Sequence, residues 1–483
     1  MRRWLIVGLC LVGCLNSVFW ATTAMADPKS VSKPNVVLVM ADDMGWGQTG
    51  FYNHPVLKTP HLDAMAANGI RFDRFYAGAS NCSPTRATVM TGRTNDRTGV
   101  QTHGYALRPQ ERTIAQVMAA NGYSTGHFGK WHLNGMRGPG APILKDDIRS
   151  PGRFGFEEWV SVTNFFDRNP IMSRKGGFEE FEGDSSEIAV AEAVKFISTS
   201  VRNKQPFFSV IWYGTPHSPF VAGKDDEAIF GDLKKDSANH YGELVAMDRS
   251  IGTLRTALRD LNVADNTLFW FCSDNGGLPK ITPATVGGLR GFKNSLYEGG
   301  LRVPSVIEWP NAVKPGQTVD VPACTVDILP TVMAATGAKD NRLPKILDGI
   351  SLVPAFQGNY TKRSQPIGFR HTKRHAWIDH EWKLVQPKPN GNWELYHLVD
   401  DFAEERNLIS EKPAIAQRMK KQFEAWNKTI EQSIAGADYP GGKVVPADPE
   451  PVVWTNLPQY APYLDEWKSR PEFKSYINRQ NKK

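Results

Sequence analysis

Three continuous apolar runs of strand length recur along the chain, at residues 35–40, 206–213 and 267–273. They are rich in β-branched and aromatic residues and lack the polar alternation of a half-exposed strand. Strands of this kind are typical of a parallel sheet whose two faces are both covered by helices. The pattern therefore predicts an α/β fold with these runs, and a shorter strand at residues 123–128, in its central sheet.

Helical patterns separate the predicted strands. We interpret Thr59 as the N-cap of a helix that has Pro60 at its first position and stops at Asn68. Apolar residues recur every three or four positions over residues 244–258 and predict one buried helical face. Further helices are expected over residues 186–199, before Asn121-Gly122, and from Thr88 to Arg93.

The pattern changes at about Tyr360. Short strand-like segments occupy residues 377–378, 382–385 and 393–398. Turns separate them, and a helical stretch follows Pro413. A chain of 483 residues also exceeds the usual size of a single core. We therefore predict a large α/β domain over residues 34–359 and a smaller domain, an antiparallel sheet with a helix, over residues 360–483.

The N-terminus has the pattern of a secretory leader. Residues 1–3 are basic, residues 4–19 are mostly apolar, and small residues at positions 24 and 26 fit a cleavage site. We predict a signal peptide over residues 1–26 and export to the periplasm or the medium. The alternative is a lipoprotein box ending at Cys14, which would anchor the chain to a membrane. No other apolar run is long enough to span a bilayer.

Composition and charge are those of an ordinary soluble domain, with 41% hydrophobic and 22% charged residues. The formal net charge of +7 suits an anionic substrate, but no basic run is long enough to predict nucleic-acid binding. Outside the leader, the cysteines are Cys82, Cys272 and Cys324. Their odd number and wide spacing argue against a disulfide framework.

Each predicted strand is followed directly by polar residues. They are Asp42 and Asp43, Lys130 and His132, His217, and Asp274 and Asn275. The carboxyl ends of parallel strands meet at one edge of a sheet, and binding sites form at that edge. Carboxylate and amide oxygens suit a hard cation such as calcium or magnesium. The two histidines leave zinc open as an alternative.

The segment Cys82-Ser83-Pro84-Thr85-Arg86 resembles the sulfatase signature Cys-x-Pro-x-Arg, and Thr91-Gly92-Arg93 follows it as in that family. Three further motifs resemble the family in the same order. They are Gly129-Lys130-Trp131-His132, Pro216-His217, and residues 288–304 around Lys293. The resemblance extends from about residue 34 to about residue 408. It departs from the usual pattern at Phe292, where many members carry glycine.

The resemblance implies a type I, formylglycine-dependent sulfatase of the arylsulfatase family. It implies the alkaline phosphatase-like fold, a large and mostly parallel sheet flanked by helices with a smaller C-terminal α+β domain. A maturation enzyme would oxidise Cys82 to formylglycine. One hydroxyl of the aldehyde hydrate would attack sulfur, and the other would then collapse the adduct and release sulfate.

The same resemblance assigns roles to the candidate residues. The implied ligands of a calcium ion, or less commonly magnesium, are Asp42, Asp43, Cys82, Asp274 and Asn275. The implied sulfate-binding residues are Lys130, His217 and Lys293. Arg86 and His132 would orient and activate the aldehyde hydrate. Either His217 or Lys293 would protonate the leaving alcohol, and the sequence leaves this choice open.

Two other functions remain open. A phosphatase or phosphonate monoester hydrolase would share the fold and the metal site, and a non-catalytic glycan-binding relative would share the fold alone. A sulfated carbohydrate or small molecule is the expected substrate, by family analogy. We interpret residues 138–177 as an irregular insertion over the site, either a substrate-binding loop or a purely structural one.

Overall fold

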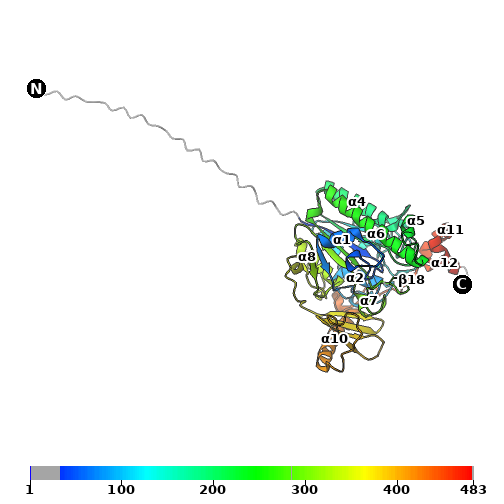
Figure 1. The fold of residues 1–483 in the computed structure, drawn as a ribbon. Helices are drawn as coiled ribbons and strands as arrows, with labels where there is room; N and C mark the ends of the chain where they lie inside the picture. Colours follow the sequence, from blue (N-terminus) through cyan, green and yellow to red (C-terminus); the bar gives the residue numbers. More distant parts are fainter. Residues whose placement is uncertain (2–32, 284, 481–483) are drawn as a thin grey trace. The chain divides into compact units, whose positions relative to one another are not determined.

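A ten-stranded mixed sheet contains all of the predicted central strands (Figure 1). In spatial order its strands are β12 (Gln317–Val319), β2 (Ile70–Phe72), β11 (Ser305–Glu308), β10 (Thr267–Ser273), β1 (Asn35–Ala41), β9 (Phe207–Trp212), β4 (Ser124–Lys130), β6 (Glu158–Val162), β7 (Ile171–Arg174) and β8 (Gly177–Glu180). Strands β10, β1, β9, β4 and β6 run parallel, so their carboxyl ends share one edge. Every residue of β1, β4, β9 and β10 is buried, which explains their continuous apolar sequences.

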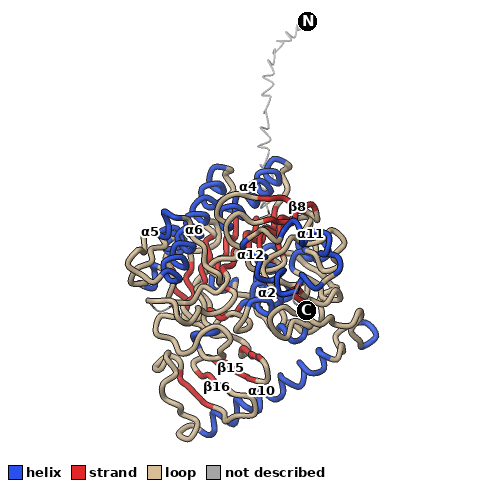
Figure 2. Tube along the Cα trace, turned by 90° about the vertical axis from the view of Figure 1, so that its right-hand side faces the viewer, coloured by secondary structure: helices blue, strands red, loops and turns tan. Residues whose placement is uncertain are grey.

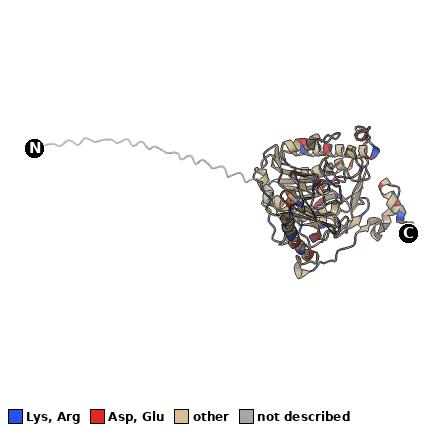
Figure 3. Ribbon diagram, turned by 60° about the horizontal axis from the view of Figure 1, so that its bottom comes forward, with Lys and Arg blue, Asp and Glu red and all other residues tan. Residues whose placement is uncertain are grey.

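The computed structural model describes Met1, residues 33–283 and residues 285–480. The predicted signal peptide and the alternative anchor at Cys14 lie outside the described residues. Within the described part, no helix has both the length and the apolar character needed to cross a bilayer. Figure 3 shows basic and acidic residues interspersed along the helices and loops.

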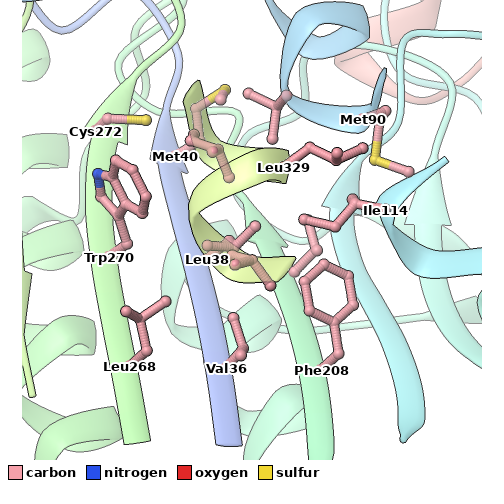
Figure 4. Close-up of a cluster of buried hydrophobic side chains, with 14 of the residues drawn as sticks. Val36, Leu38, Met40, Met90, Ile114, Phe208, Leu268, Trp270, Cys272 and Leu329 are labelled. Carbon is pink, nitrogen blue, oxygen red and sulfur yellow. The ribbon is translucent and has the colours of Figure 1, made fainter. Parts of the chain in front are cut away.

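Helices cover both faces of the sheet. On one face, α4 (Ser185–Arg202) and α6 (Lys235–Asp260) pack against alternate residues of β1, including Val37 and Val39. On the other face, Val36, Leu38 and Met40 contact Met90, Ile114 and Leu329 (Figure 4). These last three residues belong to α2 (Cys82–Thr91), α3 (Ile114–Ala120) and α8 (Ile328–Thr336). The predicted helices before Asn121 and over residues 186–199 are therefore confirmed.

One predicted helix start was wrong, and another was confirmed without a side-chain cap. Helix α2 begins at Cys82 rather than at Thr88, because Pro84 lies in its first turn, where backbone N–H groups have no partner within the helix. Helix α1 (Pro60–Ala67) lies where expected, but Thr59 makes no side-chain cap. Its hydroxyl instead accepts a hydrogen bond from the Gly50 N–H and donates one to Asp63.

Residues 138–177 form more regular structure than the sequence indicated. Strand β6 extends the parallel part of the sheet, and the hairpin β7–β8 adds two antiparallel strands. These strands are only four or five residues long, so their periodicity is weak. Residues 138–150 and the segment between β6 and β7 remain as loops, and the Gly140 N–H donates to the Phe165 carbonyl to join them.

The C-terminal part contains the predicted antiparallel sheet. Its strands are β14 (Ile367–His371), β15 (Arg374–Asp379), β16 (Trp382–Gln386) and β17 (Glu394–His397). Helix α10 (Pro413–Ile434) packs Met419 and Phe423 against Trp377 and Leu384 of this sheet. The fold class is thus confirmed as a large, mostly parallel α/β sheet with a smaller antiparallel unit. The predicted boundary at residue 360 stays a prediction.

The last described residues pack against the part of the chain that follows β4. Strand β18 (Val452–Val453) pairs with β5 (Met136–Arg137) in a separate two-stranded sheet. Helices α11 (Ala461–Trp467) and α12 (Pro471–Gln480) follow it (Figure 2). An aromatic cluster joins these elements to residues near the start of β7. Its members include Trp454, Tyr460, Trp467, Phe473, Ala141 and Ile171.

Candidate active site

The structure brings all of the predicted site residues to the carboxyl edge of the sheet. Asp42 and Asp43 follow β1, His217 follows β9, Asp274 and Asn275 follow β10, and Lys130 and His132 lie at the end of β4. Helix α2 contributes Cys82 as its first residue and Arg86 one turn later. Lys293 comes from the loop before α7 (Glu298–Leu301).

A buried group of oxygen ligands lies at the centre of this edge. Carboxylate oxygens of Asp42, Asp43 and Asp274 and the sulfur of Cys82 lie within 4.8 Å of one another. The Asn275 side-chain nitrogen is 2.7 Å from Asp43 Oδ1. Among the described residues, Asp42 Oδ1 and Asn275 Oδ1 have no hydrogen-bond partner. These donors fit a hard divalent cation, which binds carboxylate and amide oxygens.

The carboxylates also repel one another. Burial, followed by the charge of Asp42, raises the pKa of Asp274 to about 7. Burial alone would raise the pKa of Asp42 as well, but Lys130 and other cations hold it below its ordinary value. A bound cation would add positive charge where the acids are most crowded.

Three basic side chains surround the acids. Lys130 Nζ lies 2.6 Å from Asp42 Oδ2, and an Arg86 nitrogen lies 2.7 Å from Asp274 Oδ2. Lys293 Nζ lies 2.7 Å from Asp43 Oδ2 and 3.4 Å from the sulfur of Cys82. Arg86 and Lys130 are fully buried. The arrangement can present several N–H donors to an anion in a site with little access to water.

Cys82 is a poor nucleophile as a thiol. Burial, and next the charge of Asp42, raises the pKa of its thiol well above the ordinary value. The reactive form of a cysteine is the thiolate, so an unmodified Cys82 would remain protonated at neutral pH. Its position at the first turn of α2 directs the side chain toward Asp43 and Lys293.

Two histidines flank Cys82 on another side. His132 is buried, and neither ring nitrogen has a hydrogen-bond partner among the described residues. Buried polar groups usually have a hydrogen-bond partner, so the ring nitrogens of His132 can bind a group that enters the site. The ring of His103 lies edge-on to His132, with 4.7 Å between centroids. A nitrogen of each histidine and the sulfur of Cys82 lie within 4.8 Å of one another.

The sequence analysis missed His103. The residue lies in a loop without a motif, and the Gly104 N–H donates to Ser83 Oγ at 2.9 Å, which holds this loop against the start of α2. A hydrogen bond from Asn81 to Thr102 Oγ1 holds the same loop, and such long-range contacts bring His103 to the site. Burial and the neighbouring Lys130 lower the pKa of His103 to about 3, so its ring is neutral.

His217 presents one ring nitrogen to the acids. Its Nδ1 lies 2.6 Å from the Ser218 carbonyl, which can only accept, so Nδ1 carries the proton. Its Nε2 is 3.8 Å from Asp43 Oδ2, and its ring stacks on Phe165 with 4.7 Å between centroids. Burial and Lys293 lower the pKa of His217 to about 4.

Comparison with known proteins gives consistent matches. A family model described as Sulfatase matches residues 34–338, and one described as N-sulphoglucosamine sulphohydrolase, C-terminal, matches residues 290–429. Arylsulfatase A of Homo sapiens is 32% identical over 392 residues, which cover 72% of this chain and 72% of the relative. N-acetylgalactosamine-6-sulfatase of Sus scrofa is 32% identical over 410 residues, which cover 78% of this chain and 76% of the relative.

A solved structure agrees with these relatives. The crystal structure of Ps i-CgsB in complex with k-i-k-neocarrahexaose superposes with a TM-score of 0.74 at 28% sequence identity. The match covers 82% of this chain and 92% of that one.

Proposed function

The chain belongs to the sulfatase family of the alkaline phosphatase-like superfamily, and we propose that it hydrolyses sulfate esters of carbohydrates through an aldehyde made from Cys82. Its family makes it a sulfuric ester hydrolase. The observation that carries the proposal is the position of Cys82, which lies among buried acids, two lysines and an unpartnered histidine.

The family uses a metal ion, and we assign its ligands here to Asp42, Asp43, Asp274 and Asn275, with the modified Cys82. Calcium fits these oxygen donors best, and magnesium is the alternative. Such a cation, when bound, polarises a sulfate oxygen and offsets negative charge. The crowded acids and the two unpaired oxygens support this assignment.

The remaining residues bind the sulfate group and orient the aldehyde. Lys130, Lys293 and His217 would hold the sulfate oxygens, where negative charge increases during transfer. His132 and Arg86 would position the group at residue 82. Neither ring nitrogen of His132 has a hydrogen-bond partner among the described residues, so both can bind that group. The proton for the leaving alcohol would come from Lys293, or from His217 once its Nε2 has gained a proton, because the neutral ring carries its proton on Nδ1.

The aldehyde supplies a nucleophile that a thiol cannot replace, because its hydrate has a second hydroxyl that releases the sulfate. The raised pKa of Cys82 supports this conversion, since the unmodified thiol would stay protonated. A formylglycine-generating or equivalent maturation enzyme is therefore the proposed partner of the new chain.

We also propose that residues 1–26 are a signal peptide and that the protein is exported. A mature N-terminus at Asp27 in the soluble fraction would agree with this. A lipid-modified N-terminus at Cys14 would contradict it and indicate a membrane-anchored enzyme.

A comparison of sulfate and phosphate esters with the same leaving group tests the proposed function. The mature enzyme should hydrolyse 4-nitrophenyl sulfate and a sulfated sugar, with a kcat/KM well above that for 4-nitrophenyl phosphate. A preference for phosphate or phosphonate esters would favour the alternative hydrolase. Saccharide binding without turnover of any ester would favour a glycan-binding protein.

Lys293→Ala is expected to lower kcat/KM for sulfate esters roughly a hundred- to a thousandfold, which corresponds to a loss of about 3–4 kcal/mol of transition-state stabilisation. The physical reason is the loss of a charged donor aimed at a group that gains negative charge. The effect should persist with an activated aryl sulfate if Lys293 holds the sulfate, and should shrink if it protonates the leaving group.

Lys314→Ala is the matched control for Lys293→Ala, because Lys314 is an exposed loop lysine outside the site. It should leave kcat/KM unchanged. If the Lys293 variant stays within a few-fold of the wild type on both activated and unactivated esters, Lys293 has no role in transfer.

A further inference from the structure

A cavity of about 460 Å³ adjoins the candidate active site. Phe165 and His217 form part of its wall, and His217 also lies 3.8 Å from Asp43. His217 therefore lies between the cavity and the buried acids of the candidate site. Its volume falls within the range of small-molecule pockets, about 300–1,000 Å³.

The opposite wall comes from the end of the chain. Pro471, Glu472, Ser475 and Tyr476 of α12 line the cavity, which also touches the loop after β6. Phe473 and Ile477, on the other side of α12, are buried in the aromatic cluster with Trp454 and Trp467. A helix anchored in this way can form a fixed wall.

Arg470 adds a polar attachment just before α12. Its guanidinium lies 2.6 Å from Glu472, 3.0 Å from Glu180 of β8 and 2.6 Å from the Asn169 carbonyl. These contacts tie the start of α12 to the β7–β8 region. Arg470 is shared between Glu472 and Glu180, so Glu472 still contributes negative charge to the cavity.

The polar groups of the loop have open hydrogen-bonding capacity. Asp167 and Arg168 line the cavity, and neither forms a side-chain hydrogen bond or ion pair with another described residue. Burial, and then Asp184 and Glu472, raise the pKa of Asp167 well above its ordinary value. Asp167 offers carboxyl oxygens to a ligand, and Arg168 offers N–H donors. Together the two residues suit the paired hydroxyls of a sugar.

Much of the remaining lining is apolar. Pro139, Ile171, Pro219 and Phe165 provide flat surfaces against which the apolar face of a sugar ring can pack. Among the described residues that line the cavity, Arg168 is the cationic group, and the two acids Asp167 and Glu472 line the cavity with it. A second strongly anionic substituent would meet no surplus of positive charge there.

We propose that this cavity binds the sugar that carries the scissile sulfate, that the sugar is neutral rather than a uronic acid, and that α12 helps to select it. The inference rests on the proposed sulfatase function and extends it to the leaving group. Asp167 and Arg168 bind hydroxyls of the ring, Phe165 packs against the ring, and Ser475 and Tyr476 limit its size.

Ser475→Trp tests the proposal, because a bulky residue at this exposed position of α12 would fill the cavity without disturbing the buried side of the helix. The substrates are galactose 6-sulfate and N-acetylgalactosamine 6-sulfate as neutral sugars, a 2-O-sulfated uronic acid, and 4-nitrophenyl sulfate. Asn478→Trp is the matched control, since Asn478 is exposed on the same helix and does not line the cavity. Inhibition by inorganic sulfate monitors the sulfate-binding part of the site separately.

We expect the wild type to prefer at least one neutral sugar to the uronic acid. Ser475→Trp should lower kcat/KM for that sugar tenfold or more through KM, with less than a threefold change for sulfate inhibition and for Asn478→Trp. A preference for the uronic acid, or an unchanged KM in Ser475→Trp, would overturn the inference while leaving sulfatase activity established. A wild type without activity on any sulfate ester would instead refute the proposed function.

Discussion

Replacing Cys82 by alanine is expected to lower kcat/KM for sulfate esters on the order of 10⁴- to 10⁶-fold, because it removes the proposed covalent nucleophile. The stability should change far less, by about 1 kcal/mol, since only a small buried side chain is shortened. Cys82→Ser should lose as much activity unless the maturation enzyme also oxidises serine. Steady-state kinetics on 4-nitrophenyl sulfate would measure the loss.

The control for Cys82→Ala is Cys324→Ala, because Cys324 is equally buried and belongs to β13 (Ala323–Cys324), outside the site. It should leave the rate unchanged. Peptide mass analysis of active protein should find an aldehyde or its hydrate at position 82 and an unmodified thiol at position 324. Full activity from protein that carries an unmodified thiol at Cys82 would refute the aldehyde mechanism.

The central strands were predictable because burial on both faces requires apolar residues at every position. Residues 35–41 and 267–273 are buried throughout, so they tolerate no polar alternation, and each ends directly before a pair of polar residues. Parallel pairing of β1 with β10, residue 35 opposite residue 267, then places Asp42 beside Asp274. The acids of the candidate site follow from this register alone.

Other parts of the site depend on contacts that no local pattern records. The loop of His103 is held beside Cys82 by the hydrogen bonds of Gly104 to Ser83 and of Asn81 to Thr102. Helix α12 lines a cavity with His217, and its buried side packs in a cluster built from distant segments. Strand β6 pairs with β4, β7 with β6 and β8 with β7, so the place of these short strands depends on their neighbours. Helix α2 was placed too late because Pro84 looks like a break, although a first turn tolerates it.

The acids also explain why the cation should matter for more than catalysis. In the metal-free fold, Lys130 and Lys293 outweigh burial and hold the pKa values of Asp42 and Asp43 below their ordinary values. Burial and the charge of Asp42 raise the pKa of Asp274, which records the cost of burying this third acid. For an acid whose pKa is higher in the folded state, stability is lost as the pH rises above its unfolded value toward neutrality. Calcium binding should restore that stability at pH 7.

Chelation is therefore expected to lower the activity more than about a thousandfold, because the cation would stabilise the negative charge of the transition state by several kcal/mol. Restoring calcium to about a hundred times its dissociation constant should raise the free energy of unfolding by about 2.7 kcal/mol. Asp274→Asn should lose both the activity and this calcium-dependent gain. Denaturant titrations with and without calcium would measure the gain separately from turnover.

Asp274→Asn should still fold, because it keeps the shape of the side chain and removes one of the crowded negative charges. Without metal its stability should lie within about 1 kcal/mol of the chelated wild type. Asp232→Asn is the control, since Asp232 is exposed and distant in sequence from the cluster, and it should keep both the activity and the calcium response. A chelated wild type that retains its rate, or an Asp274→Asn variant that retains the full calcium response, would show that these acids do not bind the cation.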